Sequence, residues 1–220
     1  MSHARSYGVT PDGERVEGWP ARLAGVTETV IATKGPNDHW NQAALGISPT
    51  GGNDEEIPAG ATTAATARSY GRTRTRRNLD AGRDAYVQFT TDPVDFVEAA
   101  LTTFETDEPI LERSAAWTRI ECEERKRTVD RGTEIVTWTL EPVESGVRTR
   151  SVPTANRARA AVIEATVPAS RLDVDGYDEA DLLARLESLA SVVDATGDAR
   201  TLAAFDSIDE YVGWRDRIRE

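Results

Sequence analysis

The sequence predicts an α+β protein in which a barrel-like β part is followed by a small helical region. Two observations carry this prediction. Between residues 25 and 144, short segments alternate apolar with polar side chains and are separated by turn residues, a pattern typical of antiparallel strands. After Thr154 the apolar residues recur at helical spacing, and this change marks the junction of the two parts.

The chain divides into three predicted segments. Residues 1–20 carry Gly and Pro among polar residues and are expected to form a flexible leader. Residues 21–150 form the predicted β-barrel, and residues 151–220 form the predicted helical C-terminal region.

The barrel is expected to begin with a hairpin. Strands are predicted over Gly25–Thr33 and Asn41–Ser48, because both segments show alternating apolar positions, and the sequence KGPND between them supplies turn residues. The second strand is rich in small residues, which permits two interpretations. Either a flat ligand approaches its backbone closely, or a neighbouring strand packs tightly against it.

Further alternating segments complete the predicted barrel. The expected strands are Ala59–Ser69, Asp84–Thr90, Ala116–Val129 and Thr133–Glu144. The last two are joined through Asp-Arg-Gly, which is a hairpin turn signal, so we expect them to pair.

Helices are predicted where a capping residue precedes apolar residues at helical spacing. Asp92 followed by Pro93 starts one such helix inside the barrel region. In the C-terminal region, one helix carries five apolar positions with helical spacing, namely Ala158, Ala161, Val162, Ala165 and Ala169. Two more are expected after Asp178 and Asp198, and Gly197 ends the first of these.

The stretch Ala67–Gly82, with the sequence ARSYGRTRTRRNLDAG, contains five arginines, although the chain as a whole is acidic. Thr73 is a good N-cap and Gly82 a good stop, so a short helix is predicted. The threonine hydroxyls and the guanidinium groups of Arg72 and Arg74 suit a phosphate, such as the tail of a cofactor. The alternative is a solvated turn in which arginine replaces lysine.

The formal net charge is -12, and the only lysines are Lys34 and Lys126. Acidic residues are spread along the chain, which favours a protein of a high-salt cytoplasm over an acidic patch for a basic partner. Nucleic-acid binding is not expected, because it requires positive charge that displaces counterions.

Few side chains are suited to zinc binding or nucleophilic catalysis. Cys122 is the only cysteine, and His3 and His39 are the only histidines, so neither a disulfide, a metal site nor a Ser-His-Asp site is expected. No run of about 18 apolar residues occurs, and the first residues lack a signal core. We therefore expect a soluble, cytoplasmic protein with no membrane partner.

Five blocks of the sequence carry a resemblance to a known family. In chain order they are Glu28–Thr33, Asn41–Ile47, Arg72–Leu79, Val87–Leu101 and Asn156–Leu172. Their order and spacing resemble the archaeal domain-of-unknown-function family 447, which belongs to the FMN-binding split β-barrel proteins. The resemblance implies a split barrel that binds FMN, usually at a homodimer interface.

The chain departs from the family pattern at four positions. Leu45 replaces a proline, Arg72 a glycine and Arg76 a tyrosine. Gln88 stands where the family tends to have asparagine.

The resemblance also assigns expected contacts with FMN. Thr73, Thr75 and Asn78 match the family's Ser, Thr and Asn and are expected at the phosphate, and Arg74 is added on its charge alone. The strand expected along the isoalloxazine ring supplies Asn41, Ala43, Leu45 and Gly46. The residues expected near the edge of the ring are Gln88 and Thr90.

The implied function is that of a flavoprotein reductase, or a related oxidoreductase, acting on an unidentified small molecule. In such a protein the flavin carries the electrons, and the chain positions it, with backbone N–H groups of Ala43–Gly46 as expected donors. Two alternatives remain: a non-catalytic flavin-binding or storage protein, and a dimeric scaffold with an empty site. No Gly-x-Gly-x-x-Gly sequence follows a predicted strand, so no nicotinamide-binding motif is identified.

Overall fold

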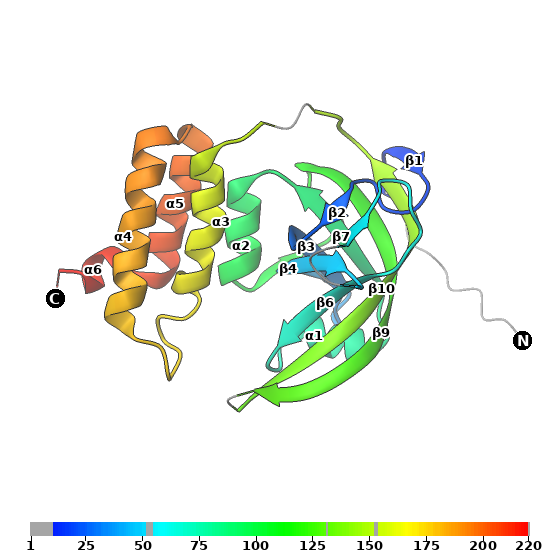
Figure 1. Ribbon diagram of the computed structural model, residues 1–220, viewed down its shortest axis with the longest axis horizontal. Helices are drawn as coiled ribbons and strands as arrows, with labels where there is room; N and C mark the ends of the chain where they lie inside the picture. The colour runs from blue at the N-terminus through cyan, green and yellow to red at the C-terminus, as the bar shows by residue number, and fades with distance from the viewer. Residues whose placement is uncertain (1–10, 52–54, 131, 152–153, 220) are drawn as a thin grey trace, which may run out of the picture.

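Six antiparallel strands form a closed barrel in the computed structural model, which describes residues 11–51, 55–130, 132–151 and 154–219 (Figure 1). The strands are β3 (Thr27–Lys34), β4 (Trp40–Pro49), β6 (Ala65–Tyr70), β7 (Ala85–Thr90), β9 (Ser114–Asp130) and β10 (Thr133–Val147). Their order is β10-β6-β4-β3-β7-β9, and pairing of β9 with β10 closes the ring. The predicted α+β class and the barrel are confirmed.

The two predicted hairpins are both present. β3 pairs with β4 along its whole length, from Thr27 opposite Ile47 to Lys34 opposite Trp40. β9 and β10 form the second hairpin and extend beyond the barrel as a two-stranded arm (Figure 1). Arg131, at the centre of the predicted turn, lies outside the described residues. β10 continues to Val147, past the predicted end of the strand at Glu144.

Four very short strands were not predicted. β1 (Glu14–Val16) pairs with the end of β10, and β8 (Phe104–Thr106) pairs with β4. β2 (Leu23–Ala24) and β5 (Glu56–Ile57) form a separate two-stranded ribbon. Segments of two or three residues are too short to show a hydrophobic period, so the sequence pattern gives no signal for them.

The described part of the predicted leader is ordered against the barrel. β1 is hydrogen-bonded to β10, and the Trp19 side chain is fully buried, with its indole N–H donating to the carbonyl oxygen of Thr63 at 2.9 Å. Burial of one tryptophan side chain removes a large apolar surface from water, which offsets the cost of ordering this segment. Residues 1–10 of the predicted leader lie outside the described residues.

The interior of the barrel is filled by large apolar side chains from the strands. The core includes Ile31, Ile47, Val87, Trp138 and Leu140, all at most 2% exposed. These residues alternate along their strands with neighbours that face away from the barrel interior. The apolar burial is the main contribution to the stability of the barrel.

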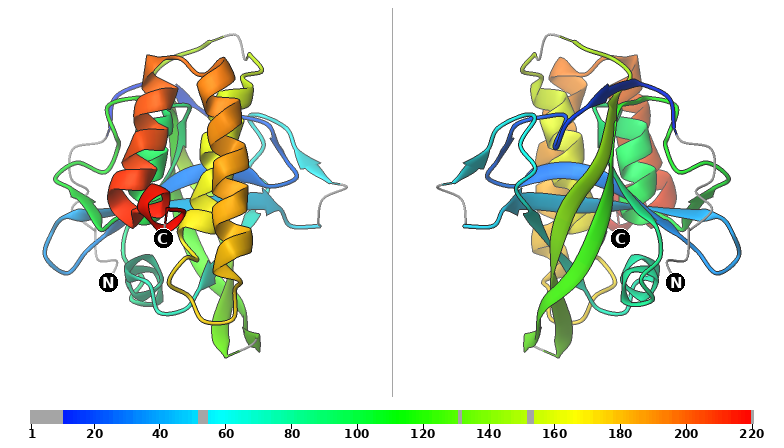
Figure 2. Two further views of the ribbon diagram at one scale, coloured as in Figure 1. Left: turned by 90° about the vertical axis from the view of Figure 1, so that its left-hand side faces the viewer. Right: turned by 90° about the vertical axis from the view of Figure 1, so that its right-hand side faces the viewer.

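A helical layer covers one side of the barrel (Figure 2). It consists of α2 (Pro93–Leu101), α3 (Arg157–Ala169), α4 (Glu179–Thr196), α5 (Ala199–Val212) and α6 (Trp214–Arg217). The predicted caps Asp92, Asp178 and Asp198 each accept backbone hydrogen bonds at the start of a helix. α6 was not predicted. No helix among the described residues is long and apolar enough to cross a membrane.

α2 joins the helical layer to the barrel. It contacts β3 and β4 on one side and α3 and α5 on the other. Phe96 and Ala99 pack with Val30 of β3, whereas Val97 packs into the core shared by α3 to α6. The barrel and the C-terminal helices therefore share this one helix, although it lies within the barrel region in the sequence.

Candidate functional site

The arginine-rich stretch forms α1 (Arg74–Asp80), a short helix at one end of the barrel. Thr73 is extended, and its hydroxyl accepts a hydrogen bond from the Arg76 amide at 3.2 Å, which caps the helix. Gly82 has φ +62°, a left-handed conformation that suits glycine just beyond a helix end. Leu79 packs into the barrel core and fixes the helix in place. The predicted helix and both of its boundaries are confirmed.

Two buried amide side chains fasten α1 to the first hairpin. Asn41 Nδ2 donates to Thr75 Oγ1 at 3.0 Å, and Asn78 Nδ2 donates to Thr33 Oγ1 at 3.0 Å. All four side chains are buried. Buried polar groups that satisfy one another hold a unique arrangement, so α1 keeps a fixed position relative to β3 and β4.

A cleft of about 420 Å³ lies between α1 and the turn that joins β3 to β4. We call it the arginine cleft. Along α1 its lining residues recur at i, i+3, i+4 and i+7, which places them on one face of the helix. The full lining is Gly35, Pro36, Asn37, Asn41, Arg74, Arg77, Asn78, Ala81, Arg83 and Glu105.

The arginine cleft is positively charged in a protein of formal net charge -12. Three arginines and one glutamate line it, which gives a formal charge of +2. Arg74 Nη1 is paired with Glu105 Oε1 at 2.9 Å. Arg77 and Arg83 instead donate to the backbone carbonyl oxygens of Arg72 and Gly35, at 3.2 and 3.1 Å.

Arg77 and Arg83 make no ion pair with any carboxylate of the described ranges. Each guanidinium has five N–H donors, and a single backbone bond leaves most of them available. The arrangement therefore offers charge-assisted hydrogen bonds to an anion that enters the cleft.

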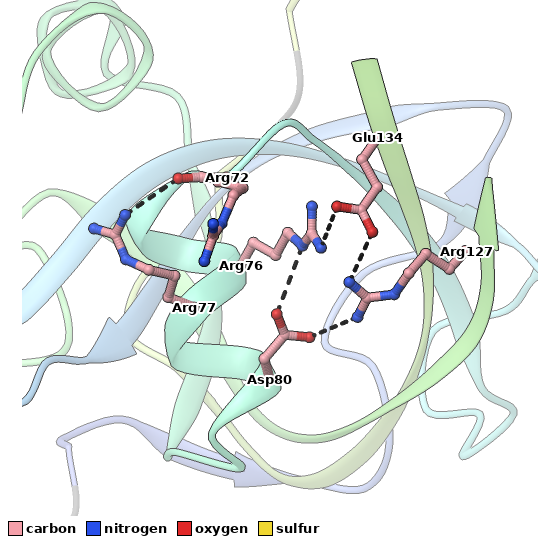
Figure 3. A pocket seen from close by; sticks show the side chains of 6 residues that line it. All are labelled: Arg72, Arg76, Arg77, Asp80, Arg127 and Glu134. Atoms are coloured by element: carbon pink, nitrogen blue, oxygen red, sulfur yellow. Dashed lines mark hydrogen bonds and ion pairs between the residues drawn. The ribbon is translucent and has the colours of Figure 1, made fainter. Parts of the chain in front are cut away.

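The opposite face of α1 carries a closed ring of ion pairs (Figure 3). Arg76 bonds Glu134 at 2.8 Å, and Arg127 bonds the same carboxylate at 2.9 Å. Asp80 completes the ring, 3.1 Å from Arg127 and 3.6 Å from Arg76. Hydrogen bonds from Arg127 and Arg76 hold the pKa of Glu134 below its usual value. This ring ties α1 to the β9–β10 arm.

Arg72 lies on this second face and not in the arginine cleft. With the four residues of the ring and Arg77, it lines a smaller pocket of about 280 Å³. In the ring, two arginines and two carboxylates neutralise one another. Its four arginines and two carboxylates give a formal charge of +2, the same as that of the arginine cleft, so the two pockets differ in volume and not in charge.

Strand β4 has a gap in its second edge, which we call the open edge. Trp40–Gln42 pair with β8 on that edge and Ile47–Pro49 pair with β6, while Ala43–Gly46 pair only with β3 among the described residues. Backbone N–H and C=O groups that point away from β3 in this gap have no strand partner. Such groups are strong donors and acceptors for another molecule.

The side chains of the open edge have different roles. Ala43 and Leu45 face the barrel core. A Cβ added to Gly46 would lie 2.7 Å from Cγ1 of Val26, an exposed side chain just before β3, so Gly46 leaves room for Val26. The tight-packing interpretation is thus supported at Gly46. The flat-ligand interpretation is supported by the missing strand partner of Ala43–Gly46 among the described residues.

The structure does not bring Gln88 or Thr90 to the arginine cleft. Gln88 is fully buried, and its Oε1 accepts hydrogen bonds from the Leu111 amide at 2.7 Å and the Ser114 hydroxyl at 3.0 Å. Its Nε2 donates to Gln42 Oε1 at 2.7 Å. Thr90 Oγ1 accepts from the Asp92 amide at 3.1 Å, at the start of α2.

The threonines expected at a phosphate are engaged within the chain. Thr73 caps α1, and Thr75 accepts the hydrogen bond from Asn41. Among the residues expected at FMN, only Asn41, Arg74 and Asn78 line the arginine cleft. Their direct contact with a cofactor stays a prediction.

Sequence reasoning missed Arg77, Arg83, Glu105 and the turn Gly35–Asn37 as parts of the site. The helical spacing of Arg74 and Arg77 was visible in the sequence and indicates one shared face. Nothing in the sequence indicated that Glu105 lies beside Arg74, because a three-residue strand places it there.

The described residues offer neither a reactive thiol nor a cluster of metal-ligating side chains. Burial raises the pKa of the Cys122 thiol to about 12, so this thiol is protonated at neutral pH. In the described ranges, no three His, Cys, Asp or Glu residues gather in a way that could hold a metal ion. The arginine cleft and the open edge are therefore the features of this structure best suited to binding a ligand.

The fold and the cleft define a split-barrel protein with a C-terminal helical layer. Models of one family match both parts: the N-terminal domain of the protein of unknown function DUF447 matches residues 27–149, and the DUF447 C-terminal model matches residues 156–210. The chain belongs to the DUF447 family.

Several solved structures are similar to this chain. An FMN-bound DUF447 protein from Methanosarcina mazei is 23% identical, with a TM-score of 0.70 over 86% of this chain and 95% of that chain. The flavoredoxin from Methanosarcina acetivorans is 8% identical, with a TM-score of 0.40 over 67% of this chain and 79% of that chain. An FMN-binding protein from Thermus thermophilus is 13% identical, with a TM-score of 0.41 over 69% and 87%. No curated protein matches the chain.

Proposed function

We propose that this protein binds FMN, with the phosphate in the arginine cleft and the isoalloxazine ring along the open edge of β4. The observation that carries the proposal is the adjacency of these two features. Asn41 lines the cleft, and Ala43 begins the open edge two residues later, which is about 7 Å along a strand. One elongated ligand can therefore engage both.

The phosphate end fits the charges of the cleft. Arg77 and Arg83 have no carboxylate partner in the described ranges, and Arg74 lies on the same face of α1 as Arg77. Guanidinium groups bind phosphate oxygens through charge-assisted hydrogen bonds, which are stronger than neutral ones. A dianionic phosphate monoester is the ligand group that this set of donors favours.

The ring end fits the backbone of the open edge. The edge of an isoalloxazine ring carries both hydrogen-bond donors and acceptors, as does an unpaired strand edge. Ala43 and Ala44 have small, partly buried side chains, and small side chains allow a flat group to approach a strand closely. The residues present thus fit FMN at both of its ends.

Membership of the DUF447 family supports the same ligand. The Methanosarcina mazei member of this family is described as FMN-bound, and its fold corresponds to this chain over most of its length. The proposal of FMN for this protein is supported by that similarity together with the arginine cleft and the open edge.

We propose that the FMN-bound protein is an oxidoreductase that acts on a small molecule. FMN, when bound, supplies hydride and single-electron transfer. The chain's own contribution is to hold the phosphate through arginines, to orient the ring by backbone hydrogen bonds and to restrict water at the barrel end. The competing functions are flavin storage without catalysis and a scaffold with an empty site.

Spectroscopy and mass analysis of the purified protein test the proposal. We expect a yellow protein that releases FMN on denaturation, and bleaching by a reduced nicotinamide with reoxidation by an acceptor. A bound flavin that no donor reduces would favour storage. A colourless protein that binds neither added FMN nor riboflavin would favour the scaffold.

We also propose a homodimer in which a second copy covers the flavin site. Large apolar side chains of the barrel lie exposed: Val26, next to Gly46 of the open edge, is 62% exposed, and Tyr70, opposite Ile135 at the end of β6, is 55% exposed. Exposed apolar surface of this kind is typical of interfaces. Light scattering in high salt should give a mass twice that of the chain, and a monomer that still binds FMN tightly would contradict the shared site.

A further inference from the structure

Glu105 is the only carboxylate among the described residues that line the arginine cleft. It lies on β8, directly opposite Asn41 of β4. Its Oε1 is 2.9 Å from Arg74 Nη1, and the side-chain Nδ2 of Asn37 donates to its two oxygens at 3.4 and 3.5 Å. The carboxylate therefore already occupies the position of an anion at Arg74.

We propose that Glu105 is a specificity-determining residue, an internal counter-ion that a ligand's phosphate must displace from Arg74. This inference rests on the proposed function, since the incoming phosphate is taken to be that of FMN. By holding Arg74, Glu105 excludes monoanions, while a phosphate dianion that also contacts Arg77 and Arg83 displaces it.

The physical basis is competition between a tethered anion and a free one. A carboxylate fixed beside its partner has a high effective concentration, so a dissolved monoanion competes poorly for Arg74. The pair is partly exposed, with side chains 47% and 30% accessible, and exposed ion pairs are weak. A dianion that contacts three guanidinium groups gains more binding free energy than is lost from the one ion pair that it breaks.

The competing explanation is purely structural. Arg74 and Glu105 also join α1 to β8, so the pair could serve only to hold these elements together. In that case, loss of the Glu105 charge would loosen the cleft and weaken every ligand. The two explanations predict opposite changes in FMN affinity.

The variant Glu105→Gln separates them, because it removes the charge and keeps the size of the side chain. We expect FMN to bind about tenfold more tightly to Glu105→Gln than to the wild type, with riboflavin binding unchanged. Acetate, at constant ionic strength, should compete with FMN in the variant and not in the wild type. Unchanged or weaker FMN binding, or an equal gain for riboflavin, would overturn the proposal.

The matched control is Asp107→Asn. Asp107 is two residues away and exposed, pairs with His39 and does not line the cleft. This variant makes the same change in net charge close to the site, and we expect FMN binding within about twofold of the wild type. A tenfold gain in this control would show that general electrostatics, and not Glu105, sets the affinity.

A double-mutant cycle adds a second readout. Glu105 acts through Arg74, which is already paired in the wild type and free for the phosphate in Glu105→Gln. Arg74→Ala should therefore cost less FMN affinity in the wild type than in the Glu105→Gln background. Equal losses in the two backgrounds would mean that the two side chains act independently, which contradicts the proposal.

Inorganic phosphate tests Glu105 independently of the flavin. Phosphate should raise the Tm of Glu105→Gln more than that of the wild type at equal ionic strength. Equal stabilisation, or none in either protein, would overturn the role of Glu105. If neither protein binds FMN but phosphate still distinguishes them, the proposed function fails and the counter-ion role stands.

Discussion

At the scale of single residues, Asp95 is the carboxylic acid among the described residues whose pKa shifts furthest from its ordinary value. It lies in the first turn of α2 and is 7% exposed. Burial, and then the neighbouring charge of Asp92, raises the pKa of Asp95 to about 6. Arg113 and Arg200 oppose this shift from 3.8 and 3.7 Å, which are distances too long for direct hydrogen bonds.

The raised pKa gives a prediction for stability. Asp95 binds a proton more tightly in the folded protein than in the unfolded chain, so its contribution to the free energy of unfolding increases as the pH falls from about 6 towards 3.8. Asp95→Asn should therefore stabilise the protein at pH 7, by at most about 3 kcal/mol. Denaturant unfolding of both proteins at pH 7 and pH 5 measures the difference.

The control for this prediction is Asp181→Asn, which removes an exposed acid from the first turn of α4. We expect no stabilisation from that change. A protein less stable at pH 7 after Asp95→Asn, or an equal effect of the substitution at both pH values, would contradict the assignment.

Residue types predicted the site only in part. Asn41, Arg74 and Asn78 line the arginine cleft. These three were among the predicted residues because the pattern of the α1 stretch and the resemblance both indicated this end of the barrel. Thr73 and Thr75 have hydroxyls of the right type, but a cap and a buried amide engage them. A sequence shows which groups can bind a phosphate and not which of them the fold already uses.

At the scale of elements, α1 is attached to the barrel through two of its faces. One face is fastened to the first hairpin by Asn41 and Asn78, and the other to the β9–β10 arm by the ion-pair ring. Arg76 is the buried member of that ring, with a side chain 5% exposed, and it also donates to the Gly71 carbonyl at 2.9 Å. The position of the cleft arginines depends on this attachment.

Arg76→Ala should destabilise the protein by about 3 kcal/mol, because it removes a buried cation and leaves the carboxylates of the ring underpaired. The comparison is Arg127→Ala, whose side chain is 38% exposed and whose loss should destabilise the protein clearly less than that of Arg76. Denaturant unfolding measures both. Equal losses of unfolding free energy in the two variants would show that burial of Arg76 does not increase its contribution to stability.

Elements long enough to show a period were predicted, and shorter ones were not. The hairpins, α1 and the capped helices each follow from alternation, helical spacing or a capping residue, as at Thr73 and Asp178. β8 has only three residues and is defined by its pairing with β4. The sequence could not indicate Glu105 as part of the site, because its position depends on that pairing.

At the scale of the whole molecule, the barrel and the helical layer were predicted, but their connection was not. α2 follows β7 in the sequence and packs against α3 and α5, which lie far away along the chain. Its apolar positions indicated a buried face without indicating what covers it. Long-range packing of this kind is not encoded in local periodicity.

The charge of the whole molecule gives a further prediction. With a formal net charge of -12, repulsion among carboxylates should lower stability at low ionic strength, since screening acts over about 10 Å near 0.1 M salt. We expect the Tm to rise from dilute buffer to multimolar KCl at constant pH. A Tm that is flat over this range would contradict adaptation to a high-salt cytoplasm.

The central claim is that the arginine cleft holds the phosphate of FMN. Arg77→Ala and Arg83→Ala should each remove charge-assisted hydrogen bonds worth roughly 1.5–3 kcal/mol, which is about a ten- to hundredfold loss of FMN affinity. Riboflavin lacks the phosphate, so its binding should stay within about twofold. Arg22→Ala, which removes an exposed arginine paired with Glu56, is the matched control and should change neither.

The most direct measurement is therefore a titration of FMN and riboflavin into the wild type, Arg77→Ala, Arg83→Ala and the Arg22→Ala control. The account predicts loss of FMN affinity alone, in the two cleft variants alone. FMN affinity unchanged in both cleft variants, or FMN and riboflavin weakened together, would contradict it.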